Sequence, residues 1–264
     1  MSTLNSQHAA ISARGIQKRF GAVVAAADIN LDIPHGQKLS LIGSNGAGKT
    51  TFVNMLTGFI APDEGHILLH GEDITGLAPR RITRMGVARS FQIPQLYKEL
   101  SVLDNMLVAV ASQHDSLSFW RPAKNVAAIA RAHELLERFE LSTHADRLVG
   151  ELPGGVRKLL DIAMALTKQP KLLLLDEPTS GVSGDEKFPM METVMRALAQ
   201  ESVTVLFVEH DMDMVHDVSD WVVVMAEGRI IAEGTPEQIS SNPAVIEAYL
   251  GTHQGKSLLE EENA

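Results

Sequence analysis

The octapeptide Gly43-Ser44-Asn45-Gly46-Ala47-Gly48-Lys49-Thr50 fits the pattern G-x-x-x-x-G-K-[ST]. Its glycines let the backbone curl so that successive N–H groups point at phosphate oxygens, and the following helix adds its positive N-terminal end. Lys49 places a cation on the β- and γ-phosphates, and Thr50 offers a hydroxyl to Mg²⁺. A plain glycine-rich turn is the alternative. The flanking segments, an apolar strand at 38–42 and a helix at 50–56, favour a phosphate-binding loop.

The segments on either side of this loop alternate between apolar strands and helices. Residues 11–33 read as two strands around a turn near Gly21, and 66–70 as a further short strand. Later strands are predicted at 86–92, 171–176, 203–209, 221–226 and 229–232, with a helix at 186–199. Buried strands that alternate with helices predict an α/β fold with a mainly parallel sheet.

The middle of the chain differs, because strand signals fade over 95–160 and helical spacing appears. Apolar residues recur there at intervals of three and four, on one face of a helix: Val126, Ile129, Ala132, Leu136 and Phe139. We expect a helical lobe at about 95–160, inserted between core segments at about 10–94 and 161–235. The polar and acidic tail at 251–264 is expected to fray.

Composition limits the classes of function. A length of 264 residues favours one domain with an inserted or appended lobe. The 23 basic against 33 acidic residues give a charge of -10, which argues against nucleic acid as the main partner. The absence of cysteine excludes disulfides, Cys-ligated zinc and thiol catalysis. No apolar run approaches the ~20 residues of a membrane-spanning helix, so we expect any membrane role to come through docking.

Two carboxylates, Asp176 and Glu177, follow the apolar run at 172–175. They lie at the carboxyl end of a predicted buried strand, which is where ligands bind in a parallel sheet. Asp176 suits Mg²⁺, directly or through water. Glu177 can polarise an attacking water, since phosphoryl transfer depends mostly on positioning and charge stabilisation. An N-cap pair before the next helix is the alternative interpretation.

Four more features lie along the chain. In order, they are Phe20, Gln92 within Ser90-Phe91-Gln92, the stretch Leu152-Pro153-Gly154-Gly155-Val156, and His210 after the strand at 203–209. With the phosphate loop and the two carboxylates, they make the sequence resemble the nucleotide-binding subunits of ABC transporters over nearly its whole length. The resemblance implies a P-loop NTPase core, an antiparallel β subdomain near the N-terminus and an inserted helical subdomain. It also implies a single ABC ATPase domain over 10–250.

The resemblance implies an ATP hydrolase with a role for each motif. Phe20 and residues 43–51, the last of which is Thr51, would bind ATP. Thr50, Gln92 and Asp176 would hold Mg²⁺. Glu177 and His210 would be the catalytic residues. Two such subunits would close head to tail around two ATP molecules, so that residues 152–156, the signature, act on the partner's ATP.

The ending of the chain resembles one branch of the family, the ATP-binding subunits of branched-chain amino acid importers. The matching residues are Gly234-Thr235-Pro236-Glu237-Gln238-Ile239, Asn242-Pro243 and Ala248-Tyr249-Leu250-Gly251. That branch also serves amides, urea and small organic acids. It implies three kinds of partner: a second and different ABC ATPase, two multi-spanning membrane subunits, and a periplasmic or extracellular solute-binding protein. The chain would then lie at the cytoplasmic face of the cell's inner membrane.

Three other functions compete with this one. An exporter or lipid-handling ATPase would have the same fold, and only the C-terminal ending argues against it. A non-transport ABC ATPase usually carries two cassettes or long coiled coils, whereas this chain carries one cassette and is acidic. A P-loop kinase or GTPase is disfavoured by Gln92, the Gly154-Gly155 pair and His210 in order.

The signature departs from the family's usual LSGGQ. Pro153 replaces the serine whose hydroxyl would touch the partner's γ-phosphate, Val156 replaces glutamine, and Ser183 stands where many relatives carry aspartate. These departures predict a heterodimer in which the site that uses this signature is the slower one. Separately, His210 and His216 lie among Asp211, Asp213 and Asp217, where a capped helix start is favoured over a metal cluster.

Overall fold

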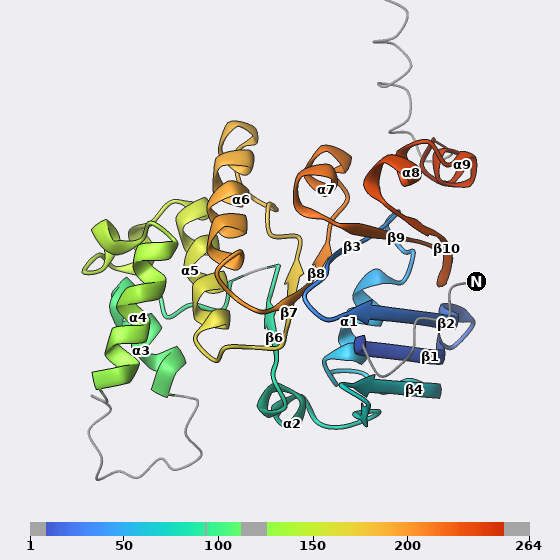
Figure 1. The fold of residues 1–264 in the computed structure, drawn as a ribbon, viewed down its shortest axis with the longest axis horizontal. Helices are drawn as coiled ribbons and strands as arrows, with labels where there is room; N and C mark the ends of the chain where they lie inside the picture. Colours follow the sequence, from blue (N-terminus) through green and yellow to red (C-terminus); the bar gives the residue numbers. More distant parts are fainter. Residues whose placement is uncertain (1–8, 93, 112–125, 251–264) are drawn as a thin grey trace, which may run out of the picture. The chain divides into compact units, whose positions relative to one another are not determined.

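The computed structural model describes residues 9–92, 94–111 and 126–250 (Figure 1). The chain forms two compact units, one of Met1–Met85 with Thr204–Ala264 and one of Gly86–Val203. The borders of these units differ from those predicted for the helical lobe, because strands on both sides of the lobe pack with its helices. The predicted extents of the core, the lobe and the single domain stay predictions, and the predicted tail lies outside the described residues.

The first unit contains an antiparallel sheet in the order β2-β1-β4-β5. Its strands are β1 (Ala9–Phe20), β2 (Val23–Pro34), β4 (Glu64–Leu69) and β5 (Glu72–Asp73). β1 and β2 pair along their length around the turn that contains Gly21. The two predicted N-terminal strands are therefore confirmed, as is the antiparallel arrangement that the family resemblance implied.

The first unit also contains strands in the order β10-β9-β3-β8. β3 (Lys38–Gly43) runs parallel to β8 (Thr204–Val208) and to β9 (Trp221–Ala226), and β10 (Arg229–Gly234) returns antiparallel to β9. The interior residues of β3, β8 and β9 are buried and, apart from Ser40, apolar, as their hydrophobic runs predicted, whereas β10 is partly exposed. The helices of this unit are α1 (Lys49–Leu56), α2 (Pro79–Arg84), α7 (Met212–Val218), α8 (Pro236–Ser240) and α9 (Pro243–Leu250).

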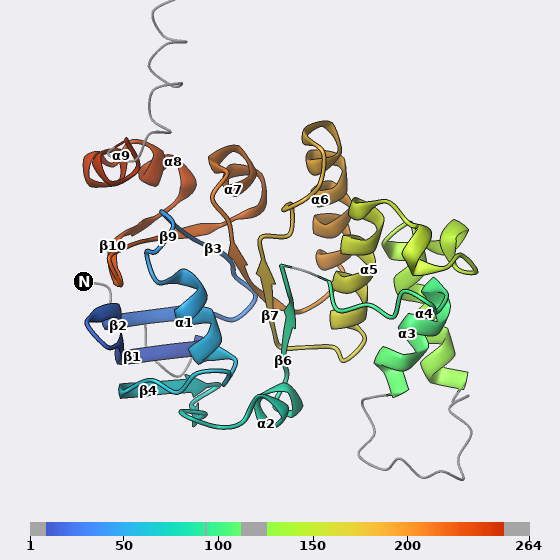
Figure 2. The ribbon, with the colours of Figure 1, turned by 180° about the vertical axis from the view of Figure 1, so that it is seen from behind.

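The second unit is built on two parallel strands, β6 (Val87–Ser90) and β7 (Leu172–Asp176). Its helices are α3 (Val102–Ala111), α4 (Val126–Arg138), α5 (Gly154–Leu166) and α6 (Gly184–Leu198), with short 3₁₀ turns at Ser142–His144 and Val149–Glu151. α5 is central, since it contacts α3, α4 and α6 as well as both strands (Figure 2). A change in the position of α5 would therefore affect its contacts with most elements of this unit.

The predicted apolar face of α4 is confirmed in its second half and wrong at its start. Ala132, Leu136 and Phe139 are buried, and Leu135, which the prediction omitted, is buried with them. Val126 is 82% exposed. It is the first residue of the helix, where the chain has not yet reached the core, and the apolar stripe widens toward the other end.

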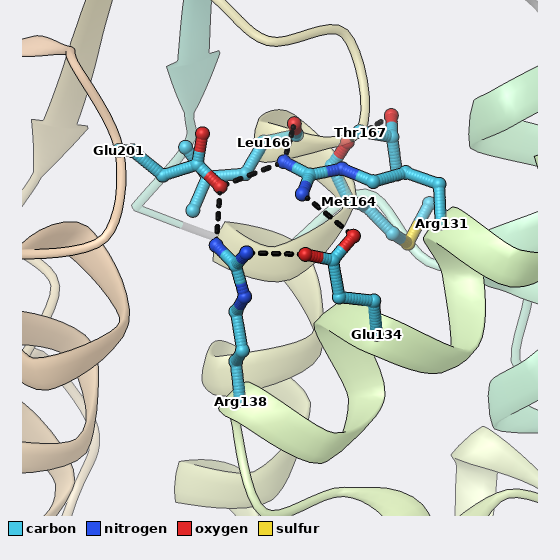
Figure 3. Close-up of polar contacts among 7 residues, drawn as sticks. All are labelled: Arg131, Glu134, Arg138, Met164, Leu166, Thr167 and Glu201. Atoms are coloured by element: carbon cyan, nitrogen blue, oxygen red, sulfur yellow. Dashed lines mark hydrogen bonds and ion pairs between the residues drawn. The ribbon is translucent and has the colours of Figure 1, made fainter.

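A charge network fixes α4 to the rest of the second unit (Figure 3). Arg131 and Arg138 both donate to Oε1 of Glu201, at 2.8 and 2.7 Å, and both also pair with Glu134. Arg131 reaches the carbonyl of Leu166 at the end of α5 as well. Across the described parts of the chain, no helix combines the length and the apolar character that crossing a membrane requires.

Candidate functional site

The phosphate loop lies between β3 and α1 in the first unit, as its flanking segments predicted. A Cβ at Gly43 would lie 2.2 Å from the carbonyl oxygen of Met225. At Gly48, where φ is 101°, it would lie 2.2 Å from that of Ala25. Glycine is therefore required at both ends of the loop by close approach of neighbouring backbone.

Lys49 begins α1 and is almost fully buried. Its Nζ donates hydrogen bonds to the carbonyl oxygens of Gly43 (2.6 Å) and Ser44 (3.2 Å), so the ammonium group lies across its own loop. The first turn of α1 carries no acidic side chain. A held cation beside a helix N-terminus is an environment that favours phosphate.

The hairpin of β9 and β10 supports the loop, which the sequence interpretation missed. The N–H of Gly228 donates to the carbonyl of Ala47 at 3.0 Å, and the carbonyl of Gly228 accepts from Ala27 at 2.8 Å. The available signal was the Glu227-Gly228 turn, which lies between the predicted strands at 221–226 and 229–232. Because these contacts use backbone atoms, no side-chain motif marks them.

Phe20 is 49% exposed, although it is a large aromatic residue. Phe20 pairs with Val23 at the turn of the β1–β2 hairpin, and Ala25, two residues after Val23, lies against Gly48. Lys18 Nζ lies 5.5 Å from the ring centroid. An exposed ring near the loop has a face available for stacking on a base.

The two carboxylates lie in the second unit at the end of β7. Asp176 Oδ2 accepts a hydrogen bond from Arg89 Nη2 at 2.6 Å, and both side chains are at most 10% exposed. Glu177 follows in a left-handed conformation with φ of 44°, which is strained for a residue with a side chain. Its Oε2 accepts from Gln92 Nε2 at 2.7 Å. The structure thus brings Gln92 and Glu177 together, as a shared site requires.

The N-cap interpretation of Asp176 and Glu177 is wrong, because α6 begins at Gly184 and its N-cap is Ser183. Sequence reasoning also missed Arg89. This arginine lies one strand away from Asp176, and its guanidinium stacks over the ring of Phe91 at 5.0 Å. No signal in the sequence set it apart from Arg80, Arg81 and Arg84, which also lie between the phosphate loop and Gln92.

The degenerate signature forms the start of α5. Pro153 is the N-cap, with φ −57° and ψ 157°, and Gly154 and Gly155 are the first helical residues. The first amides of a helix have no partner within it, and no acidic side chain lies in this first turn. The helix N-terminus is therefore retained although the serine hydroxyl is absent.

His210 is exposed and lies two residues after the end of β8, in the first unit. Asp211 Oδ1 accepts from the N–H groups of Asp213 (3.2 Å) and Met214 (3.4 Å) and so caps α7. His216 hydrogen-bonds Ser240 at 2.8 Å. The capped helix start is confirmed. Within residues 9–92, 94–111 and 126–250, no three His, Cys, Asp or Glu side chains are grouped so that they could hold a metal ion.

This combination of fold and motifs defines a class of protein. The profile of the family described as "ABC transporter" matches residues 26–180, and the chain belongs to that family. It is an ATP-binding domain of an ABC transporter and an ATP hydrolase. A second profile, described as "Branched-chain amino acid ATP-binding cassette transporter", matches residues 229–254.

Individual relatives narrow the class further. The chain is 41% identical over 253 residues to the high-affinity branched-chain amino acid transport ATP-binding protein LivG of Escherichia coli (strain K12), covering 91% of this chain and 97% of LivG. It is also 41% identical over 247 residues to BraF of Pseudomonas aeruginosa, with 90% and 96% covered. Among solved structures, the ADP conformation of MJ1267, an ATP-binding cassette of an ABC transporter, matches with a TM-score of 0.81 and 33% identity over 92% of this chain and 99% of that one. A nucleotide-free ATP-binding cassette from an ABC transporter matches with a TM-score of 0.80 and 34% identity over 91% of this chain and 98% of that one. The α/β P-loop fold is thereby confirmed.

Proposed function

We propose that the chain is the ATP-hydrolysing subunit of an importer for branched-chain amino acids or for related amino acids, amides, urea or small organic acids. The observation that carries its hydrolytic part is the hydrogen bond of 2.7 Å between Gln92 and Glu177, which holds a strained carboxylate at the end of β7. Support for the cargo class comes from the relatives named for branched-chain amino acid transport and from the profile that matches residues 229–254. An exporter or lipid-handling system is the alternative.

We assign the nucleotide to Phe20 for adenine stacking and to residues 43–51, ending in Thr51, for the phosphates. Lys49 lies across the loop, where phosphate oxygens can replace the carbonyls of Gly43 and Ser44 as its partners. Such an exchange keeps the buried ammonium group paired throughout binding.

Mg²⁺ would be held by Thr50, Gln92 and Asp176. Hydroxyl, amide and carboxylate oxygens are the hard donors that this cation prefers. The donor set fits, because Gln92 uses its Nε2 toward Glu177 and Asp176 uses its Oδ2 toward Arg89, so each keeps a second polar atom for the cation. When bound, Mg²⁺ neutralises charge that develops on the phosphates.

Glu177 and His210 would carry the hydrolytic step. Glu177 accepts a proton from a water molecule while the water oxygen bonds to the γ-phosphorus and the bond to the β–γ bridging oxygen breaks. His210 contacts the γ-phosphate and helps hold Glu177 and the water in line. The products are ADP and inorganic phosphate.

The assembly would be a heterodimer within a larger transporter. Pro153 has no hydroxyl for the partner's γ-phosphate, so we propose that the second ABC ATPase is a different chain that supplies a better signature. Two multi-spanning membrane subunits and a solute-binding protein would complete the transporter, with this chain at the cytoplasmic face. Residues 10–250 would act as one ABC ATPase domain, with 251–264 as a tail and residues 95–160 as its helical lobe.

Turnover of ATP by the purified chain and by its Glu177→Gln variant, each alone and with co-purifying partners, tests this proposal. Activity that appears only with partners and disappears in the variant supports it. Free turnover by the chain alone that the substitution leaves unchanged would overturn the role of Glu177. Full activity of a homodimer would overturn the heterodimer, because a homodimer must use the degenerate signature twice.

A further inference from the structure

Two charged side chains of opposite sign lie buried on one face of α5. Lys158 is 2% exposed and Asp161, one helical turn later, is 8% exposed. Charged groups are costly to bury unless they are paired and hydrogen-bonded. The groups that pair with these two side chains should therefore indicate why the charges are buried.

Both side chains have their partners among residues 90–92 and Gln95, a short stretch that begins at the last residue of β6 and contains Gln92. Lys158 Nζ donates to the carbonyl oxygens of Phe91 (2.8 Å) and Gln92 (3.0 Å). Asp161 Oδ2 accepts from Ser90 Oγ at 2.5 Å, and its carboxylate also accepts from the backbone N–H groups of Phe91 and Gln95. The cation holds the carbonyls of the segment and the anion holds its amides, so the backbone around Gln92 is fixed to α5.

The side chain of Gln92 points to a different partner. Its Nε2 donates to Glu177 at the end of β7, while its backbone is held by α5. α5 begins at Gly154, in the signature. One residue thus contacts the proposed hydrolytic carboxylate through its side chain and the signature helix through its backbone.

We propose that Lys158 and Asp161 are positioning residues that form a latch between the Gln92 segment and the signature helix. A changed contact at Gln92 moves the backbone of Phe91 and Gln92, and the latch passes this movement to Gly154 and Gly155 through α5. The chain's own ATP site and the site that it completes on its partner are coupled in this way. The inference rests on the roles proposed above for Gln92 and for the signature.

A purely structural role is the competing explanation, and the network of Arg138 offers a matched control. Arg138 is also largely buried in the second unit and forms ion pairs with Glu134 and Glu201 (Figure 3). None of its described contacts reaches residues 90–95. Loss of Arg138 therefore removes charged hydrogen bonds of the second unit without touching the latch.

Hydrogen exchange of the α5 amides, with and without Mg²⁺ and a non-hydrolysable ATP analogue, tests the latch. We expect the analogue to slow exchange at residues 154–160 of the natural chain and of Arg138→Met. Lys158→Met is expected to lose this response, and Lys158→Arg to keep it, because the arginine can still donate to both carbonyls. Ser90→Ala removes one hydrogen bond to Asp161 and is expected to weaken the response in a protein that folds normally.

Kinetics of the complete transporter provide a second readout. For Lys158→Met we expect an unchanged dissociation constant for the ATP analogue and a fall in kcat of ~10- to 100-fold, since misplaced catalytic groups cost rate rather than binding. An α5 response that survives in both Lys158→Met and Ser90→Ala, or that Arg138→Met abolishes equally, would overturn the latch. A natural chain that fails to bind the analogue at all would instead overturn the proposed function, and the latch with it.

Discussion

Glu177 stands in a left-handed backbone conformation, with φ of 44°, and accepts a hydrogen bond of 2.7 Å from Gln92. A residue with a side chain held in this region costs about 1–3 kcal/mol and persists only where the surrounding structure requires it. Gln92 lies 85 residues before Glu177 in the chain, so the pair cannot arise from local preference. Five other described residues with a side chain also have positive φ, so the hydrogen bond from Gln92, rather than the strain alone, supports the role proposed for Glu177.

Glu177→Gly should therefore raise stability and abolish activity together. Glycine adopts positive φ without strain, which stabilises the folded protein. The greater entropy of the unfolded chain offsets part of this effect, so we expect the free energy of unfolding to rise by about 1 kcal/mol. Denaturant unfolding measures the gain, and ATP turnover measures the loss. Glu140→Gly is the matched control, since Glu140 has φ of 59° after α4. Its stability should rise similarly with turnover intact, and a loss of turnover there would contradict the assignment.

Arg89→Met should destabilise the second unit strongly. The guanidinium pairs with Asp176 at 2.6 Å where both side chains are at most 10% exposed, and removal of one member of a buried pair leaves an uncompensated charge. We expect the free energy of unfolding to fall by about 3–5 kcal/mol. Arg196→Met, which breaks the exposed pair with Glu140, should cost under about 1 kcal/mol. Equal costs for the two variants would show that the Arg89–Asp176 pair is not a buried one.

Local sequence predicted the phosphate loop because every part of it is contiguous, from β3 through Lys49 to α1. Partners distant in the chain were not predictable in the same way. Asp161 lies 71 residues after Ser90, and Asp176 lies 87 residues after Arg89. In the sequence, Arg89 and Asp161 look like ordinary surface charges, because only the parallel pairing of β6 and β7 and the packing of α5 bring them to their partners.

The first half of α4 is a second place where the sequence alone did not predict the structure. Spacing alone placed Val126 on the apolar face with Phe139, yet Val126 is exposed and Phe139 is buried. Periodicity states which residues share a face, but only the neighbouring helices decide how far along the helix that face is covered. α3, α5 and α6 all contact α4.

Acidification should weaken the charge network of α4. The hydrogen bond from Arg131, with the charges of Arg131 and Arg138, holds the pKa of Glu134 below its usual value. A lowered folded-state pKa stabilises the folded protein above the unfolded value of about 4.3, and this contribution is lost as the pH falls through the folded pKa. Unfolding of the natural chain and of Glu134→Gln should therefore differ near neutral pH and converge in acid. A difference that persists unchanged below the unfolded pKa would contradict the ion pairing.

Pro153→Ser should stabilise the start of α5 and should also raise the rate of ATP hydrolysis at the partner's site. Pro153 occupies the N-cap with φ −57° and ψ 157°, a conformation that serine adopts readily, and serine can accept a hydrogen bond from an N–H of the first turn. We expect about 1 kcal/mol of added stability from the cap, measured by thermal unfolding. We also expect faster ATP turnover in the complete transporter, because the hydroxyl that the family places on the partner's γ-phosphate is restored. Pro153→Ala separates the two effects, since it removes proline without adding a hydroxyl. A serine variant that is more stable but turns over ATP no faster than the alanine variant would show that the missing hydroxyl does not limit the partner's site.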